Sequence, residues 1–234
     1  MKYSPLEALQ ELRGDPDKAF ANCAFMVDNS KITDNAGCNC CVEITQLIGA
    51  KHENMFLLTL RPDVKGGDYF YPYVAGGGGI GSNFVPACAP KGTLVFTGGM
   101  NGCSIQVDEV GDALMFMHCQ DGCNVPVEKS LGRKVARVDY KDYAGPKGIS
   151  LRMLSSSIGF NITERKEGFA YYYSYHLISI KRDSEHVKSS LWVIYGNCIL
   201  QVANLNKPKV KAYYKIPGTT INDLYFIATF MTRN

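Results

Sequence analysis

One cysteine and one histidine lie close together in a stretch with the pattern of a β-hairpin, residues 96–119. Apolar and polar side chains alternate over Cys103–Val107, which is the period of a half-buried strand. The apolar run Ala113–Cys119 contains His118 and predicts the return strand. A thiol beside an imidazole is the arrangement of a cysteine nucleophile, because the imidazole lowers the pKa of the thiol and carries protons.

The hairpin register decides whether these two side chains meet. If Val110 and Gly111 form a two-residue loop, Cys103 lies directly opposite His118. Opposed residues have Cβ atoms about 4.5–5.5 Å apart, which is close enough for a thiol and an imidazole to pair. A loop with an odd number of residues would pair Cys103 with Met117 and turn His118 to the other face. We expect the first register.

Thr97 lies six residues before Cys103, directly after the apolar run Thr93–Phe96. A third side chain usually orients a catalytic imidazole, and the Thr97 hydroxyl is placed to do so. Glycines in the intervening segment allow a tight turn whose backbone N–H groups face a developing oxyanion. We assign Asn101 and Gly102, which immediately precede Cys103, to this oxyanion loop.

The Thr-x5-Cys…His arrangement resembles a group of glutamine deamidases: the cytotoxic necrotizing factor catalytic domain, the Burkholderia lethal factor and the bacterial chemoreceptor glutamine deamidase. In these toxins a Ser-Gly-Cys motif opens a strand, whereas this chain has Asn101-Gly102-Cys103. Thr97 matches a threonine of the lethal factor and the chemoreceptor enzyme, and the necrotizing factor uses a backbone carbonyl there. The resemblance covers about thirty residues, Thr93 to Gly122.

The resemblance implies hydrolysis of a protein glutamine side-chain amide to glutamate. Cys103 would attack the amide, His118 would transfer protons, and Thr97 would orient His118, with no metal or organic cofactor. The implied partner is a protein substrate, because the related toxins act on Rho-family GTPases or a translation-initiation RNA helicase. The chemoreceptor enzyme acts on the cell's own receptors, but its domain is smaller than this chain. We therefore expect a toxin-like effector, secreted or delivered into a host cytosol, with a cytoplasmic protein as the alternative.

Two other classes of protein stay open. Another cysteine hydrolase or a transglutaminase would share the thiolate chemistry and differ in the leaving amine and the acceptor. In a binding or structural protein, Cys103 and His118 would be packing residues, since a lone histidine at a strand end is more often structural.

Composition sets further limits. The chain has 234 residues, 46% of them hydrophobic and 20% charged, which is typical of a globular protein. A net charge of +3 is too small to indicate nucleic-acid binding. We see no run long enough to span a membrane and no signal peptide, so we expect a soluble chain whose export would need another route or a larger parent.

Nine cysteines cannot all pair with one another, and without a signal peptide we expect reduced thiols that are mostly small buried hydrophobes. A zinc site among Cys38, Cys40, Cys41, Cys119 and Cys123 is the alternative. The chain contains no C-x2-C pair, so the spacing does not favour zinc.

The remaining patterns predict a single α+β domain over residues 1–234, with a β-sandwich core of mixed or antiparallel strands and peripheral helices. Ser4 and Pro5 begin a predicted helix that Gly14-Asp15-Pro16 ends. A second short helix is predicted for Asp17–Met26. Strands are predicted at Val42–Ile48, Met55–Leu60, Lys134–Val138, Phe169–Ile180, Leu191–Val202 and Leu224–Met231.

Residues 61–92 are rich in glycine, proline and tyrosine and predict a flexible loop bordering the cleft. Gly76–Gly81 formally matches G-x-G-x-x-G, but no helix follows, so we reject a dinucleotide site. Tyr171–Tyr175 predicts sheet packing, with a partner-binding surface as the alternative.

Several other polar side chains have ordinary structural explanations. Alternating lysines at 207, 209 and 211 indicate a solvated sheet edge, with docking of an acidic partner as the alternative. We expect His52 and His186 to be exposed and His176 to be a hydrogen-bonded residue of the sheet.

Overall fold

The structure is a computed structural model. It describes residues 2–33, 36–76, 79–122, 124–126, 129–144, 155, 169–182, 191–207, 211–216 and 226–232. Parts of several predictions lie outside these residues, among them Gly77, Gly78, Cys123, His186 and Lys209.

The N-terminal helix α1 spans Pro5–Gly14 and begins as predicted. The Ser4 side chain accepts a hydrogen bond from the backbone N–H of Glu7, and the Glu7 carboxylate accepts one from the Ser4 backbone, which completes a capping box. Helix α2 spans only Pro16–Asn22, so the prediction of a helix to Met26 is wrong. The apolar run after Cys23 instead pairs with a neighbouring strand and is buried there, because tertiary packing outweighs local helix propensity.

The larger sheet contains nine strands among the residues that the structure describes. Their spatial order is β1-β3-β2-β4-β6-β10-β11-β12, with β13 paired to β11. Their bounds are β1 Ala24–Asp28, β2 Cys38–Gln46, β3 Met55–Pro62, β4 Asp68–Phe70, β6 Leu94–Phe96, β10 Phe169–Arg182, β11 Leu191–Asn204, β12 Lys211–Ile216 and β13 Phe226–Met231. The β1–β3 and β4–β6 pairs are parallel and the other pairs are antiparallel.

The smaller sheet is antiparallel and has the order β5-β8-β7-β9. Its strands are β5 Ile80–Pro86, β7 Ser104–Val110, β8 Ala113–Cys119 and β9 Arg133–Val138. A 3-10 turn, η1 Gln120–Gly122, follows β8, and helix α3, Tyr140–Ala144, follows β9. The segment 61–92 therefore contains two strands, β4 and β5, and the prediction of one long loop is wrong. Residues 80–86, which include the end of the glycine-rich segment, form the strand β5.

The two sheets share one hydrophobic core, which confirms the α+β sandwich predicted from the strand patterns. Phe116 of β8 lies with its ring centroid 5.8 Å from Tyr71, 5.6 Å from Trp192 and 6.2 Å from Phe230. Tyr175 belongs to the same buried cluster, and Tyr171 and Tyr173 pack against it. The packing interpretation of these three tyrosines is therefore confirmed, while Tyr172 points outward and is 60% exposed.

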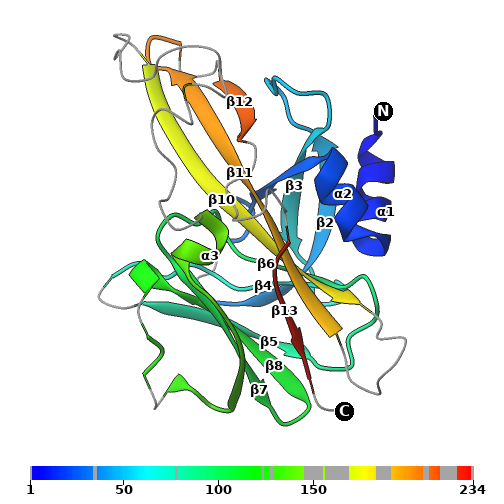
Figure 1. The fold of residues 1–234 in the computed structure, drawn as a ribbon, viewed down its shortest axis with the longest axis vertical. Helices are drawn as coiled ribbons and strands as arrows, with labels where there is room; N and C mark the ends of the chain where they lie inside the picture. The colour runs from blue at the N-terminus through cyan, green and yellow to red at the C-terminus, as the bar shows by residue number, and fades with distance from the viewer. Residues whose placement is uncertain are drawn as a thin grey trace.

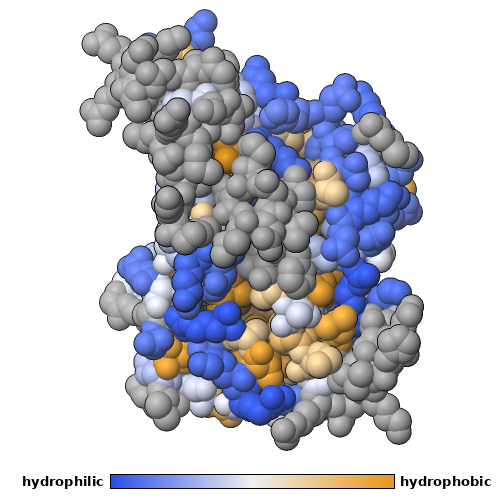
Figure 2. Space-filling model, in the orientation of Figure 1, coloured by the Kyte–Doolittle hydropathy of each residue, from blue (hydrophilic) through white to orange (hydrophobic). Residues whose placement is uncertain are grey.

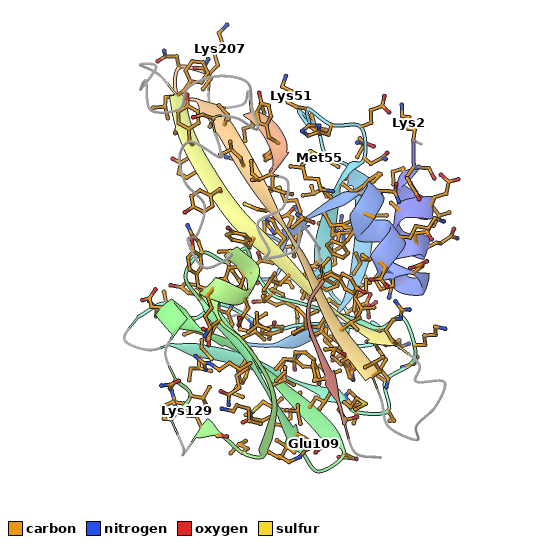
Figure 3. All side chains as sticks on the ribbon, in the orientation of Figure 1. Lys2, Lys51, Met55, Glu109, Lys129 and Lys207 are labelled. Atoms are coloured by element: carbon orange, nitrogen blue, oxygen red, sulfur yellow. The ribbon has the colours of Figure 1, made fainter. Side chains whose placement is uncertain are left out.

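Helix α3 lies near the middle of the molecule and packs against β10, with Tyr143 of α3 against Tyr175 of β10 (Figure 1). Figure 3 shows Glu109 at one end of the molecule and Lys207 at the other. Glu109 adjoins the β7–β8 turn, so the opposite ends of these strands, near Cys103 and His118, lie toward α3 and β10.

The outer surface carries both polar and apolar areas. Figure 2 shows hydrophobic side chains over the region of β5, β8 and β13. Phe84 of β5 is 46% exposed and Met231 of β13 is 57% exposed. Within the residues that the structure describes, no helix is long and apolar enough to cross a membrane.

Candidate active site

Thr97 and His118 meet across the two layers of the sandwich. Thr97 directly follows β6 of the larger sheet, and His118 lies near the end of β8 in the smaller one. The Thr97 Oγ1 atom lies 2.6 Å from His118 Nδ1, and both side chains are fully buried. The structure therefore brings together two of the three residues that the sequence singled out for catalysis.

The hairpin register differs from the predicted one by two residues. Ile105, not Cys103, lies opposite His118, and the two-residue loop is Gly111-Asp112. Gly111 has a φ of +60°, and a glycine at the first loop position is typical of a type II′ hairpin turn. The predicted loop would have placed Val110 at that first position, where a β-branched residue strongly disfavours a positive φ.

Cys103 nevertheless keeps its predicted face. A shift of two residues preserves the side-chain alternation of a strand, so Cys103, Ile105 and Phe116 all belong to the core between the sheets. Cys103 lies one residue before β7, diagonal to His118 instead of directly opposite it. Diagonal neighbours in a hairpin have Cβ atoms about 7 Å apart, farther than the predicted contact.

The His118 imidazole lies in an unusual environment for a buried ring. Its Nε2 atom has no hydrogen-bond partner among the described residues, and its ring centroid lies 5.2 Å from that of Tyr73. Burial lowers the pKa of His118 to about 4, so the ring is neutral at pH 7. If Nδ1–H donates to the Thr97 hydroxyl, the lone pair on Nε2 is available to accept a proton.

The Cys103 backbone is held by a contact that the sequence did not reveal. The Tyr143 hydroxyl of α3 donates a hydrogen bond to the Cys103 carbonyl at 2.7 Å. Tyr143 is buried and packs against Tyr175 with ring centroids 4.9 Å apart. Neither the spacing nor the local pattern of residues 140–144 indicates this contact.

The predicted oxyanion loop is ordered by its neighbours. The backbone N–H groups of Met100 and Tyr175 each donate to the other residue's carbonyl, at 2.8 and 2.9 Å. Gly102 has a φ of +93°, which makes the turn into Cys103 and favours glycine at that position. Asn101 is exposed at the tip of this loop. The loop is thus fixed close to Cys103 by the larger sheet.

The other described histidines are placed as the sequence predicted. His52 is exposed. His176 is buried, and its Nδ1 accepts a hydrogen bond from the Val27 backbone N–H at 3.2 Å. The proton must then be on Nε2, which lies 2.9 Å from Ser174 Oγ and donates to it. His176 is therefore unable to act as a base toward Ser174, and its role is structural.

Three other buried thiols lie in environments that disfavour the thiolate. Burial raises the pKa of Cys23 to about 11 and also raises the pKa values of Cys40 and Cys198. No disulfide joins the cysteines within the described ranges. Over the same ranges, no group of three His, Cys, Asp or Glu side chains has the arrangement of a metal site.

The arrangement supplies a neutral imidazole with an oriented Nδ1 and an unengaged Nε2, and a thiol on the same face of the hairpin, diagonal to it. An imidazole and a thiol on one face can serve the chemistry of a cysteine nucleophile, and both side chains are closed from solvent in this structure. No protein-family model and no curated protein sequence matches this chain.

Proposed function

We propose that this protein hydrolyses the side-chain amide of a glutamine on another protein, with Cys103 as nucleophile, His118 as base and acid, and Thr97 as the residue that orients His118. The observation that supports it most directly is the buried 2.6 Å contact between Thr97 and His118. The hydroxyl of Thr97 comes from one sheet and the imidazole from the other, so this contact requires the whole fold.

The unengaged nitrogen of His118 also supports a chemical role. A buried polar atom without a hydrogen bond costs about 1–3 kcal/mol, and such atoms in native proteins require an explanation. His118 Nε2 is one of several such atoms among the described residues, and it is the one on the proposed catalytic imidazole. A nitrogen that accepts the Cys103 proton during the reaction accounts for its lack of a permanent partner.

The reaction proceeds in two balanced stages. The Cys103 sulfur bonds to the amide carbon as its proton passes to His118 Nε2, and that proton then goes to the departing ammonia. A thioester is left on Cys103. His118 next removes a proton from water, the hydroxide attacks the thioester carbon, and the glutamate product leaves as the thiol is restored.

Substrate binding must bring the thiol and the imidazole closer together. Catalytic hydrogen bonds are often long in structures without substrate and shorten when the substrate binds. Cys103 precedes the first residue of β7, so its side chain can approach His118 by rotation without disturbing the ladder. The Cys103 backbone N–H and the neighbouring loop at Asn101 would stabilise the oxyanion.

A target-modification experiment tests the reaction. The chain is incubated with a cell lysate, and peptides are searched for a glutamine that gains about one dalton, the mass change of amide to acid. We expect such a site with the wild-type chain and with Cys88→Ser, because Cys88 is an exposed cysteine elsewhere in the structure. Cys103→Ser must abolish the modification. A gain that persists in Cys103→Ser would refute the proposed nucleophile.

Limiting iodoacetamide separates this function from a purely structural role of the same residues. Cys103 is only 6% exposed, whereas Cys88 is exposed, so accessibility alone predicts labelling of Cys88. An activated thiolate would make Cys103 the faster site, and His118→Ala would remove that advantage. Labelling that follows exposure alone would favour the binding or packing role. Peptide cleavage in place of ammonia release would indicate a different cysteine hydrolase.

The proposed biological role is that of a toxin-like effector acting on a host protein. Converting one glutamine to glutamate adds a negative charge and removes two hydrogen-bond donors. At a catalytic glutamine of a target enzyme, this single change is enough to abolish or lock its activity.

A further inference from the structure

The three proposed catalytic residues are enclosed by protein. Thr97 and His118 are 0% exposed and Cys103 is 6% exposed. A protein side chain therefore reaches them only if a covering group moves. The group that moves must touch the site on one side and solvent on the other.

Tyr73 meets this condition. Its side chain is 43% exposed, and its ring lies edge to face with His118, with centroids 5.2 Å apart and the planes at 64°. No hydrogen bond or ion pair joins Tyr73 to another described residue. Ring contacts of this kind contribute about 0.5–1.5 kcal/mol, so turning this side chain outward costs little.

The backbone on both sides of Tyr73 is fixed, which leaves its side chain as the movable part. Tyr71 is buried, and its N–H donates to the Phe96 carbonyl at 3.0 Å. The returning strand packs so closely that a Cβ on Gly81 would lie 1.9 Å from the Pro72 carbonyl oxygen, and a Cβ on Gly79 would lie 2.1 Å from that of Val74. Rotation about the side-chain bonds of Tyr73 needs no movement of this tightly packed backbone.

The backbone next to Tyr73 lies close to the strand that carries His118. Gly81 lies opposite His118 in the β5–β8 ladder, and the Pro72 carbonyl packs against Gly81, so the residue before Tyr73 is held near His118. Exposed side chains change rotamer within picoseconds to nanoseconds, much faster than a typical turnover.

We propose that Tyr73 covers the access route to His118, and that the target side chain reaches the site by displacing the Tyr73 ring. This inference rests on the proposed function for the identity of the incoming group. When the Tyr73 ring turns outward, it leaves a flat space beside the neutral His118 imidazole. An uncharged planar carboxamide suits that space, whereas a lysine or glutamate side chain would lose its hydration there without a partner charge. Tyr73 is thus a specificity-determining residue for glutamine.

Diethyl pyrocarbonate, which acylates neutral imidazoles, tests the route without any substrate. At neutral pH both buried histidines are neutral, because burial holds the pKa values of His118 and His176 at about 4. Modified peptides are quantified by mass spectrometry over time. The exposed His52 serves as the positive reference and the buried His176 as the negative one.

We expect slow modification of His118 in the wild-type chain and in Tyr73→Phe, which keeps the ring. Tyr73→Ala should raise the rate at His118 by at least about tenfold while His176 stays protected, because only one local cover is removed. Tyr73→Leu should give an intermediate rate. An unchanged rate at His118 in Tyr73→Ala would overturn the proposal. A parallel rise at His176 would overturn it as well, since Tyr73 would then support the fold in general.

The result of the diethyl pyrocarbonate experiment does not depend on the proposed reaction. Diethyl pyrocarbonate reports access to His118 whether or not Cys103 is a nucleophile, and the lysate experiment reports the chemistry whether or not Tyr73 is the cover. If the route is correct and the reaction occurs, Tyr73→Ala should also admit side chains other than glutamine, with iodoacetamide labelling of Cys103 retained.

Discussion

At the scale of single residues, the hydrogen bond between Thr97 and His118 is the contact that can be tested most directly. Thr97→Val keeps the shape of the side chain and removes the hydroxyl, which leaves the buried Nδ1 atom of His118 without a partner. We expect the free energy of unfolding to fall by about 1–3 kcal/mol in urea denaturation. Thr97→Ser, which keeps the hydroxyl, should lose clearly less. Equal losses would mean that packing, and not the hydrogen bond, holds these residues together.

The residues that contact the candidate site divide into those with a sequence signal and those without one. Thr97 was found because it lies six residues before Cys103, in the same local segment. Tyr73 and Tyr143 reach the site from segments that are distant in the chain. Each is one of fourteen tyrosines, and nothing in its neighbourhood distinguishes it before the strands are arranged. Tyr73 and Tyr143 lie near the candidate site only because β5 pairs with β8 and because α3 contacts the Cys103 backbone.

At the scale of elements, the β7–β8 turn determines where Cys103 lies relative to His118. Gly111 has a positive φ, and a Cβ added to it would meet no atom within 4 Å, so only backbone conformation limits substitution there. Gly111→Val should lower the free energy of unfolding by about 1–2 kcal/mol, the cost of a left-handed conformation. Gly111→Asn should lose much less, because asparagine tolerates this region better. If valine and asparagine are tolerated equally in urea denaturation, the turn does not have the register described above.

Strand positions were predicted better than strand partners. Side-chain alternation in residues 103–107 indicated the correct face for Cys103, since alternation depends only on local sequence. The register depends on which residue takes a positive φ, and Val110-Gly111 and Gly111-Asp112 differ by one position. The short strands β4 and β5 were missed because glycine and proline in that segment hide a pairing that the neighbouring strands impose.

At the scale of the whole molecule, the sequence predicted the fold class but not the order of the strands in the mixed sheet. The long apolar runs of β10 and β11 indicated a β-rich core, and these two strands lie side by side toward the β12 end of the larger sheet. The parallel pairing of β1 with β3 carries no local signal, because it joins a segment that was expected to be helical. The free edge of β1 is completed by side chains: Asn197 bonds the Phe25 N–H and carbonyl, and His176 bonds the Val27 N–H. These side-chain hydrogen bonds to β1 depend on the whole fold, because Asn197 and His176 are far from β1 in the sequence.

The two buried histidines make the stability of the whole molecule depend on pH. Burial lowers the pKa values of His118 and His176 from 6.5 to about 4, so the unfolded chain binds more protons than the folded one between these values. Stability is therefore fully present above about pH 6.5 and falls as the pH drops toward 4. Each histidine contributes up to about 1.4 kcal/mol per pH unit in this window.

Urea denaturation at pH 7.5, 6 and 5 measures this dependence. His176→Asn keeps a hydrogen-bond acceptor for the Val27 N–H in place of Nδ1 but does not titrate, so it should remove about half of the pH dependence. His52→Asn, at an exposed position, should leave the dependence unchanged. A wild-type stability that stays constant from pH 7.5 to 5 would show that these two imidazoles are not held neutral by burial.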